Sequence, residues 1–284
     1  MTAEALEIKP TGTSPEQLVA YSDLLSRVFG PQPKFSVAAL TWLYRDNPDG
    51  AVLGMDAWAG QRLAAHYVTI PMRAQVQGLA TRGLLSLNTA TDPDFQGKGL
   101  FTRLAAATYG AGAQAGFQFV TGFANANSTP GFIRKLAFQN VRQLQAGLLL
   151  APPRDIPAAP TDFEADWSAK GLAWRLANPA ARYTVAHRGG ILDIRSATGL
   201  PLLNCAAFLK PAFDMPARNS APWLPPLFIG LEPRVALERR GFVPVPEKLR
   251  PSPLNMIWRA LDPALPAALN PDAVVVSFLD FDPY

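Results

Sequence analysis

One stretch of the sequence decides the fold: Leu87-Asn88-Thr89-Ala90-Thr91-Asp92-Pro93-Asp94-Phe95-Gln96-Gly97-Lys98-Gly99-Leu100-Phe101-Thr102-Arg103-Leu104. Residues 83–91 have the Leu- and Thr-rich pattern of a strand, and residues 99–112 have apolar side chains at helical spacing. The first turn of a helix presents backbone N–H groups without intrahelical partners, and the helix dipole adds positive potential there. Gly97 and Gly99 allow a tight turn and close approach of a bulky anion. The stretch therefore predicts a phosphate site at the helix start.

The spacing of the glycines excludes two other phosphate-binding loops. Residue 102 is Thr, where the dinucleotide fingerprint has its third glycine. A Walker loop needs Gly-Lys-Ser/Thr after four intervening residues, and this order is absent here. Lys98 adds a positive charge between the glycines. A short Gly-x-Gly before a helix is a weak signal alone, so the flanking sequence carries the interpretation.

Outward from this stretch, the pattern alternates helices and strands. Ser14-Pro15-Glu16-Gln17 has the features of a capped helix start, and Gly30-Pro31 ends that helix. The further expected elements are a helix over 37–44, strands over 51–59, 63–71, 72–77 and 117–123, a helix over 129–136 and a strand near 144–150. Antiparallel strands followed by a β-α-β-α passage predict an α/β (α+β) mixed sheet with helices on both faces.

A proline-rich segment, residues 151–160, divides the chain and predicts domains at 1–150 and 161–284. The second part looks like a shortened copy of the first. Leu172 to Pro179 is similar to Leu40 to Pro48, and Pro233 to Phe242 is similar to Pro130 to Phe138. These patterns are short, so chance similarity is an alternative. The unit that holds Gln96 to Gly99 has no counterpart after residue 160.

The decisive stretch resembles a known motif. Asp-Pro-x-x-Gln-Gly-x-Gly-Leu-Phe after a strand is similar to motif A of the GNAT superfamily, the acyl-CoA-dependent N-acyltransferases, through Gln96, Gly97, Gly99 and Leu100. Phe101 departs from the Gly or Ala usual at the last motif position. Residues 119–138 resemble the superfamily's strand-Asn-helix-Gly-Phe passage, so the resemblance covers about half of the chain. The whole pattern looks closest to bacterial members with a second, smaller and degenerate GNAT-like half.

The resemblance implies acetyl-CoA or another acyl-CoA as cofactor, with its pyrophosphate on the glycine loop. It also implies a bulge at which the strand before the loop separates from the next strand. The backbone there would pair with the pantetheine amides, and one of its N–H groups would stabilise the oxyanion. The expected cofactor-binding residues are Thr89, Ala90, Thr91, Gln96, Gly97, Lys98, Gly99, Leu100, Phe101, Thr102, Asn125, Asn127 and Ser128. For Asn127, a turn before a helix is the alternative role.

Amine acylation needs a neutral amine and a proton for the departing thiolate. In many members of the superfamily a Tyr supplies that proton, and Ile133 occupies its position here. Tyr109, Tyr67 or water are the remaining candidates for the acid. His66 is the first candidate for the base because imidazole titrates near neutrality, and Asp92 is the second. Each of these side chains also fits a structural role, in the core or in a turn.

Composition excludes several classes of protein. The chain has 284 residues, 26 basic and 22 acidic, with no run of Lys or Arg that would follow a nucleic-acid backbone. A single cysteine, Cys205, rules out an internal disulfide. The N-terminus carries acids where a signal peptide carries bases, and no apolar stretch reaches the length of a membrane span. We expect a cytoplasmic protein without metal, nucleic-acid or membrane partners.

The predicted activity is transfer of an acetyl or related acyl group from CoA to a primary amine of a small molecule, by direct attack. An amino sugar is suggested by loose analogy only. The alternatives are an inactive CoA-binding or partner-binding module and a peptide or protein N-acetyltransferase. The junction of the two parts is expected to form the acceptor pocket. The side chains available there are Trp42, Tyr44, Arg45, Asp46, Trp58, Trp174, Trp223 and Trp258.

Overall fold

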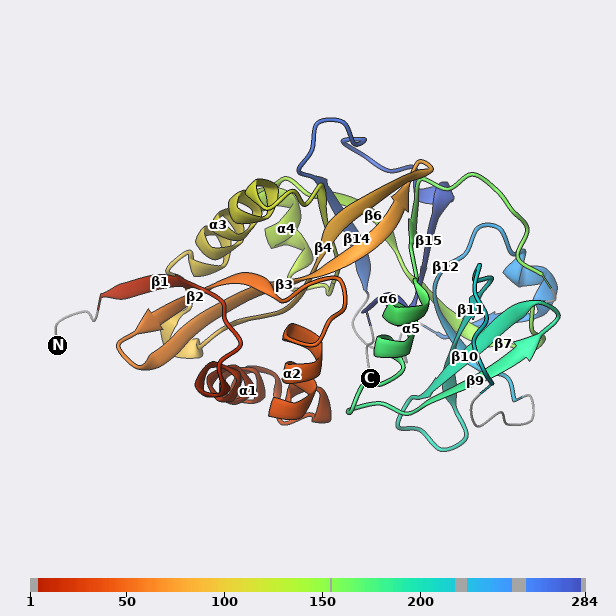
Figure 1. Cartoon of the computed structure of the whole chain (residues 1–284), viewed down its shortest axis with the longest axis horizontal. Coiled ribbons are helices and arrows are strands. Elements are labelled where there is room, and N and C mark those ends of the chain that lie inside the picture. Colours follow the sequence, from red (N-terminus) through yellow and green to blue (C-terminus); the bar gives the residue numbers. More distant parts are fainter. Residues whose placement is uncertain (1–4, 154, 218–223, 247–253, 282–284) are drawn as a thin grey trace.

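The computed structural model describes residues 5–153, 155–217, 224–246 and 254–281 (Figure 1). Its first half contains β1 (Leu6–Pro10), α1 (Pro15–Phe29), η1 (Pro33–Phe35), α2 (Val37–Tyr44), β2 (Leu53–Ala59), β3 (Arg62–Val76), β4 (Leu79–Thr91), η2 (Pro93–Phe95), α3 (Leu100–Gln114), β5 (Phe119–Ala124), α4 (Thr129–Leu136), β6 (Gln139–Gln143) and β7 (Gln145–Leu149). Its second half contains β8 (Phe163–Ala165), α5 (Ala169–Arg175), β9 (Tyr183–Arg188), β10 (Ile191–Ala197), β11 (Asn204–Leu209), β12 (Leu227–Leu231), η3 (Leu237–Arg240), β13 (Phe242–Pro244), β14 (Asn255–Ala260), η5 (Pro271–Ala273), β15 (Val274–Ser277) and α6 (Phe278–Phe281).

The helices of the first half cover both faces of its sheet. Figure 1 shows α3 and α4 above the strands β2 to β4, and α1 and α2 below them. The core on the α3 side includes Leu100, Leu104 and Val120, whereas the core on the α1 side includes Leu24, Leu40 and Ile70. The predicted mixed sheet with helices on both faces is therefore confirmed.

The first helix begins and ends where the sequence predicts. The Ser14 hydroxyl accepts a hydrogen bond from the Gln17 backbone N–H, and the Gln17 side chain accepts one from the Ser14 backbone N–H. This reciprocal pair satisfies two donors that the helix start leaves free. Gly30 follows the last turn with φ 82°, a conformation that costs glycine little.

The strands between Arg62 and Thr91 differ from the prediction. We expected separate strands over 63–71 and 72–77, with Pro71 at the boundary. A proline has no N–H to give to a ladder. Instead β3 continues through Pro71 and forms one long hairpin with β4. The Pro71 carbonyl accepts a hydrogen bond from Asn47, so this residue's backbone groups face away from β4. The pairing of β2 with β3 reaches only as far as Leu53 opposite Thr69, so at Pro71 no described strand on that side needs the missing N–H.

The two halves exchange one strand each. β14, from the second half, lies between β5 and β6 of the first half and pairs antiparallel with both. β7, from the first half, lies between β12 and β13 of the second half and pairs antiparallel with both. One sheet of 15 strands results. The division at residues 1–150 and 161–284 stays a prediction, and each of these segments holds a strand in the sheet of the other.

The exchange makes the correspondence of the halves visible. The run α2, β2, β3, β4, β5 of the first half has the counterpart α5, β9, β10, β11, β12. In place of α3, the described residues between β11 and β12 form no helix. β4 and β5 are parallel neighbours, as are β11 and β12. The tandem, two-part architecture is thus present, and the second half is the smaller one.

A pair of tryptophans joins the halves with near two-fold symmetry. The Trp42 indole N–H donates to the carbonyl of Trp174 at 2.9 Å, and the Trp174 indole N–H donates to the carbonyl of Trp42 at 3.1 Å. Their rings stack with centroids 4.7 Å apart. The two similar sequence segments around these residues therefore form matching helices, α2 and α5, that contact each other.

None of the helices in the described part of the chain has the length and apolar character needed to cross a membrane.

Candidate functional site

The glycine loop lies open at the start of α3. Gly97 and Gly99 have φ of 76° and 70°, in the left-handed region that glycine adopts most readily. Both are exposed, and a Cβ at either position would meet nothing within 4 Å. No side chain caps the first turn of α3, so its leading amides have no partner within the helix. This geometry suits the binding of an anionic group.

Asp92 anchors the loop. Its buried carboxylate accepts hydrogen bonds from Arg62 Nη2 at 2.7 and 2.8 Å and is also paired with Arg27. It accepts from the Asp94 backbone N–H as well, which starts η2. Burial raises the pKa of Asp92, but the hydrogen bonds from Arg62 and Asp94 outweigh that effect and leave the pKa below its usual value. The side chain is thus placed to hold the loop, and its predicted role as a base stays a prediction.

The strand before the loop is bulged and separates from its neighbour. Between the pairs His66–Ala90 and Val68–Leu87, β4 carries two residues, Asn88 and Thr89, against one residue of β3. Asn88 has φ 45°. The pairing of β4 with β5 runs only from Gly83–Phe119 to Ser86–Gly122. Among the described residues, no strand pairs with Leu87 to Thr91 of β4 on the β5 side, as the resemblance implied.

Phe101 does not obstruct the helix start. Its ring packs edge-to-face against two other rings. The centroid distance is 5.2 Å to Phe132 of α4 and 5.8 Å to Tyr67 of β3. A Cβ on Gly131 would lie 3.1 Å from this ring, so α4 approaches closely because residue 131 is glycine. The side chain of Phe101, at the last motif position, therefore packs between α3 and α4.

Two tyrosines predicted as acids form a buried chain. The hydroxyls of Tyr67 and Tyr109 are hydrogen-bonded to each other, and the Tyr67 hydroxyl also lies 2.9 Å from Ser86 Oγ. Burial raises the pKa of Tyr67 to about 12 and raises the pKa of Tyr109 further. The guanidinium carbon of Arg259 lies 5.2 Å from the centroid of the Tyr109 ring. The chain ends at Ser86, the last β4 residue that pairs with β5.

His66 lies inside a second polar network. Its Nδ1 is 2.6 Å from Asp56 Oδ1 and its Nε2 is 3.2 Å from the Tyr44 hydroxyl, and its ring stacks on Tyr21 at 4.3 Å. Asn88 Nδ2 donates to the Tyr44 hydroxyl at 3.0 Å. That bond leaves the hydroxyl proton of Tyr44 for His66 Nε2, so Nδ1–H donates to Asp56.

The network reaches the bulge only through Tyr44 and Asn88. His66, Asp56 and Tyr44 are fully buried, so an acceptor amine does not reach the imidazole in this conformation. The predicted role of His66 as base stays a prediction, and its surroundings favour a positioning role for it. The sequence did not single out Asp56 or Asn88, because neither lies in a motif and both are brought to His66 only by strand pairing.

The predicted residues before α4 form a turn. Asn125 Oδ1 accepts hydrogen bonds from the backbone N–H groups of Asn127 and Ser128 and from the Ser128 hydroxyl. Ser128 Oγ accepts in return from the Asn125 N–H. Asn127 is exposed. Of the three, Asn127 has the side chain most available to a ligand.

The aromatic residues expected in the acceptor pocket do not lie together: some belong to the core and others line a cavity. Trp258 is fully buried and donates to the Pro266 carbonyl, so it belongs to the core. Trp174 and Leu85 line a cavity of about 30 Å³ between the halves, with Asp280 at its wall. Trp223 lies outside the described residues.

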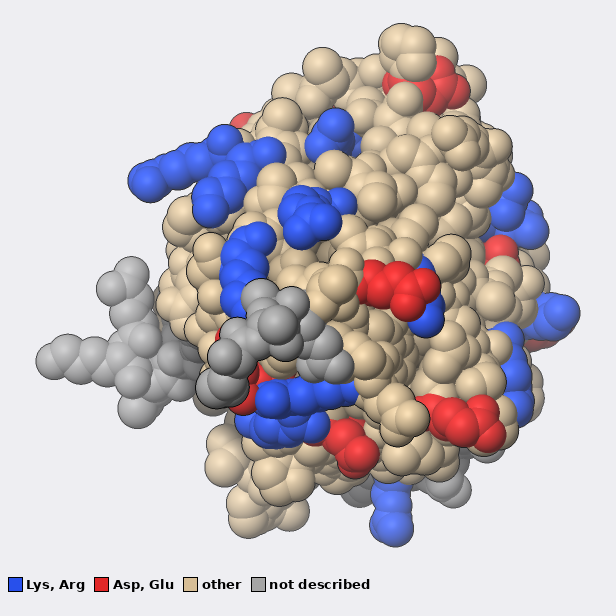
Figure 2. Space-filling view, turned by 90° about the vertical axis from the view of Figure 1, so that its left-hand side faces the viewer, with Lys and Arg blue, Asp and Glu red and all other residues tan. Residues whose placement is uncertain are grey.

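The loop end of the molecule carries basic side chains. Figure 2 shows Lys and Arg gathered over the side of the molecule that includes β1, the β2–β3 turn and the start of α3. Lys98 lies 4.7 Å above the Phe95 ring, within the loop itself. Positive potential at this end favours an anionic ligand. The described residues hold no cluster of His, Cys, Asp and Glu that would bind a metal ion.

No family model matches the sequence, and no curated protein is significantly similar to it. Solved structures do match over most of the chain. The GCN5-related N-acetyltransferase from Kribbella flavida is 12% identical, with a TM-score of 0.62 over 91% of this chain and 71% of that one. A tandem GNAT protein from the clavulanic acid biosynthesis pathway is 12% identical, with a TM-score of 0.52 over 91% of this chain and 99% of that one.

A third structure, a probable N-acyltransferase from Enterococcus faecalis V583, is 10% identical with a TM-score of 0.51. It is matched by 71% of this chain, which spans 57% of its length. Such low identities establish the fold and leave the chemistry to the residues of this chain. The open glycine loop, the bulged fourth strand and these matches together show that the chain has the GNAT fold, in a tandem arrangement.

Proposed function

We propose that the chain is an acyl-CoA-dependent N-acyltransferase that acylates a primary amine of a small molecule. The observation that carries this proposal is the open start of α3, where two exposed glycines in left-handed conformation precede an uncapped first turn. The cofactor diphosphate binds there, to the amides of Leu100, Phe101 and Thr102 and beside Lys98. Gln96 belongs to the same loop, and the exposed Asn127 precedes α4, whose Gly131 lies against Phe101.

The free edge of β4 receives the rest of the cofactor. Residues 89–91 follow the bulge and have no strand beside them on the β5 side. Their backbone groups pair with the amides of pantetheine, as a peptide adds to the edge of a sheet. The thioester then lies near Asn88 and Ser86, where β4 and β5 separate. A backbone N–H of β4 stabilises the oxyanion that forms at its carbonyl.

The reaction is direct attack. The neutral amine nitrogen bonds to the carbonyl carbon of the thioester, the carbon–sulfur bond breaks, and CoA leaves as a thiolate that takes up one proton. The amine loses one proton as the amide forms, so the protons balance. Ser86, at the end of the Tyr67–Tyr109 chain, is one protein hydroxyl at this separation, and water is the alternative proton donor. An acetyl group and an amino-sugar acceptor are the first combination to test.

A second candidate is a cofactor-binding module without catalysis. The burial of Tyr67, Tyr109 and His66 favours it, because none of them faces an acceptor directly. Thiol release from acetyl-CoA, measured across a panel of amino sugars, other small amines and peptides, separates the two candidates. Turnover with any small amine supports the enzyme, and turnover with peptides alone identifies a peptide N-acetyltransferase. CoA binding by calorimetry without turnover on any amine supports the module, and absence of CoA binding contradicts both.

A further inference from the structure

Asn88 is held in a special conformation at the bulge of β4. Its φ of 45° lies in the left-handed region, which asparagine adopts more readily than most residues because its short side chain can hydrogen-bond locally. The side chain is half-buried, and its Nδ2 donates a hydrogen bond to the Tyr44 hydroxyl of α2 at 3.0 Å. The amide is therefore fixed on one side by α2, just beyond Ser86, where the pairing of β4 with β5 ends.

The buried network behind Tyr44 decides which end of this amide faces outward. Asp56 accepts a hydrogen bond from the Tyr21 hydroxyl at 2.7 Å, and a carboxylate offers only acceptors. His66 Nδ1, 2.6 Å from Asp56, therefore carries a hydrogen, and Nε2 of the neutral ring accepts from Tyr44. Burial raises the pKa of the Tyr44 hydroxyl, so Tyr44 keeps the proton that it donates. Its oxygen is left as an acceptor, which turns the Asn88 amide nitrogen inward and the amide oxygen outward.

The outward atom, Asn88 Oδ1, is open to a ligand. It accepts no hydrogen bond from the described residues. It is also not among their buried side-chain atoms that lack a partner, so it has accessible surface. An amide oxygen held in this orientation accepts a hydrogen bond from a ligand N–H or O–H group and offers no donor of its own.

The bulge places this oxygen on the α1 side of the sheet. Ser86 and Asn88 would share one face of a regular strand, because side chains alternate with a period of two. Ser86 contacts Tyr67, which belongs to the core on the α3 side, whereas Asn88 contacts Tyr44, which belongs to the core on the α1 side (Figure 1). The extra residue in β4 thus turns Asn88 to the opposite face. A group that approaches the separation of β4 and β5 from the α1 side meets Oδ1.

We propose that Asn88 Oδ1 accepts a hydrogen bond from the acceptor amine while its nitrogen attacks the thioester, a catalytic contact that rests on the proposed function. The lone pair of the nitrogen forms the carbon–nitrogen bond, and the electron pair of the broken carbon–sulfur bond leaves with sulfur. One proton leaves the nitrogen for water, and the thiolate takes one up. Asn88 itself neither gains nor loses a proton.

The contact is stronger in the transition state than in the bound substrate. The nitrogen becomes positive as it attacks, so its hydrogen bond to Oδ1 becomes charge-assisted, and only such a gain accelerates the reaction. A primary amine also keeps one N–H for Oδ1 after it has lost a proton, whereas a secondary amine keeps none. Tyr44, His66 and Asp56 are positioning residues in this scheme, because they act through the amide of Asn88.

Two CoA derivatives test the contact without knowledge of the natural acceptor. CoA alkylated on sulfur with N-methylacetamide places an amide N–H where the acceptor nitrogen would lie. CoA alkylated on sulfur with methyl acetate has an ester oxygen in place of that N–H and the same shape. In calorimetry we expect the amide to bind about fivefold more tightly than the ester, as one net hydrogen bond predicts. Equal binding, or tighter binding of the ester, overturns the inference.

Asn88→Gly tests whether the side chain is needed or only the bulge. Glycine adopts the left-handed conformation readily, so the bulge and the affinity for CoA should be kept, while the difference between amide and ester should vanish. Gln77→Gly is the matched control, because Gln77 has φ 49° and lies exposed at the other end of the same hairpin. It should keep the fivefold difference. A difference that persists in Asn88→Gly overturns the contact.

Tyr44→Phe tests the orienting network. It removes the acceptor that holds Asn88 Nδ2, so the amide is free to rotate and the difference should shrink to about twofold. An unchanged difference overturns the role of the network. With any amine that proves to be a substrate, Asn88→Gly should also lower kcat about tenfold and leave the KM for acetyl-CoA unchanged. An unchanged kcat overturns the catalytic role.

Binding of CoA itself separates this inference from the proposed function. If the wild-type protein binds CoA and binds the two derivatives equally well, the inference fails and the proposed cofactor site stands. If it binds neither CoA nor the derivatives, the proposed function fails and the inference fails with it. If it prefers the amide through Asn88, the inference stands.

Discussion

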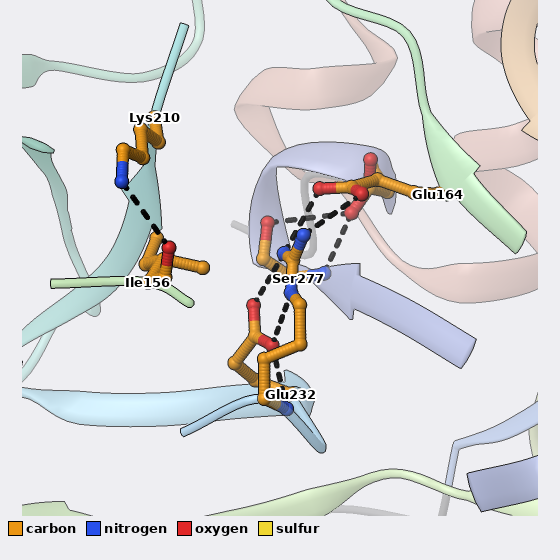
Figure 3. A network of polar contacts seen from close by, with 7 residues as sticks. Ile156, Glu164, Lys210, Glu232 and Ser277 are labelled. Carbon is orange, nitrogen blue, oxygen red and sulfur yellow. Dashed lines mark hydrogen bonds and ion pairs between the residues drawn. The ribbon is translucent and has the colours of Figure 1, made fainter. Parts of the chain in front are cut away.

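The two halves of the molecule share an order of elements but treat the same place in the fold in opposite ways. In the first half, β4 and β5 separate beside an open loop with exposed glycines and a free helix start. In the second half, β15 pairs with β12 where β11 leaves it, and two glutamates, Glu164 and Glu232, enclose Arg234 nearby (Figure 3). The difference follows from one unit: the first half has α3 and its glycine loop, and no described residue of the second half forms an equivalent.

The second half has no glycine loop among its described residues, but it completes the sheet of the first half. It contributes β14 to the sheet of the first half, and it receives β7 in return. Trp42 and Trp174 link the two by reciprocal hydrogen bonds and stacking. Neither half completes its sheet alone, so we expect the chain to unfold as one cooperative unit.

The largest expected effect concerns this link. Trp174→Ala and Trp42→Ala should each lower the free energy of unfolding by about 3–4 kcal/mol, because each removes a large packed ring and an indole hydrogen bond. Urea titration followed by circular dichroism measures the loss. The double variant should lose less than the sum, by about 1–3 kcal/mol, because both substitutions break the same contact. Additive losses would show that the two rings are energetically independent.

The second prediction compares the effect on CoA affinity of one substitution in the glycine loop with that of a matched substitution in the second half. Gly99→Glu places a carboxylate where we propose that the cofactor diphosphate binds, and we expect CoA affinity to fall about hundredfold, equal to about 2.7 kcal/mol. Gly199→Glu is the matched control, since Gly199 is also exposed, has φ 81° and has open space around a Cβ. It lies in the β10–β11 turn of the second half and should leave CoA affinity unchanged. Calorimetry with CoA decides, and equal affinity in both variants would move the diphosphate elsewhere.

A third prediction uses pH to test the buried carboxylate of Asp280. Because folding raises the pKa of Asp280 from 3.8 to about 6, the folded protein binds this proton more tightly than the unfolded chain. The contribution to stability is present below about pH 4 and is lost as pH rises through about 6. Asp280→Asn should therefore raise the free energy of unfolding near pH 7.5 by about 2 kcal/mol, below the roughly 3 kcal/mol of the full shift. Thermal or urea unfolding from pH 4 to pH 7.5 measures the difference, which should vanish at the acid end.

Asp193→Asn is the control for that experiment. Asp193 is also a buried carboxylate of the second half, but Arg188 and Arg195 bind it at 2.6 and 2.9 Å. The substitution takes the negative charge away from these two cations and should destabilise the protein. A loss of stability in both variants near pH 7.5 would mean that the Asp280 carboxylate is satisfied in the fold.

The smallest expected effect concerns the His66 network. Tyr44→Phe removes the hydroxyl that joins His66 to Asn88 at the bulge, so turnover should fall about fivefold, equal to about 1 kcal/mol, with CoA affinity retained. Steady-state kinetics and CoA calorimetry test the two parts separately. An unchanged turnover would remove this network from the mechanism, and a matching loss of CoA affinity would assign it to cofactor binding.

Much of the first half could be predicted because its signals are local. The capping box at Ser14, the glycines at 97 and 99 and the helix over residues 129–136 depend on neighbours within a few positions. The strand boundary expected after Pro71 was wrong, because a proline interrupts a sheet only where a strand pairs on its N–H side. Asp92 resembled an ordinary turn residue, and only the fold shows that Arg27 and Arg62 reach it.

The sequence by itself determined where an anion can meet a helix start, since backbone conformation and helix periodicity are set by adjacent residues. Only the tertiary structure decided which strands the halves exchange, that His66 meets Asp56 and Tyr44 in the core, and that Asp280 has a buried oxygen without a hydrogen-bond partner among the described residues. These outcomes depend on pairing between segments that are distant in the chain. Such pairing is chosen by the packing and charge of the whole molecule, so no local pattern records it.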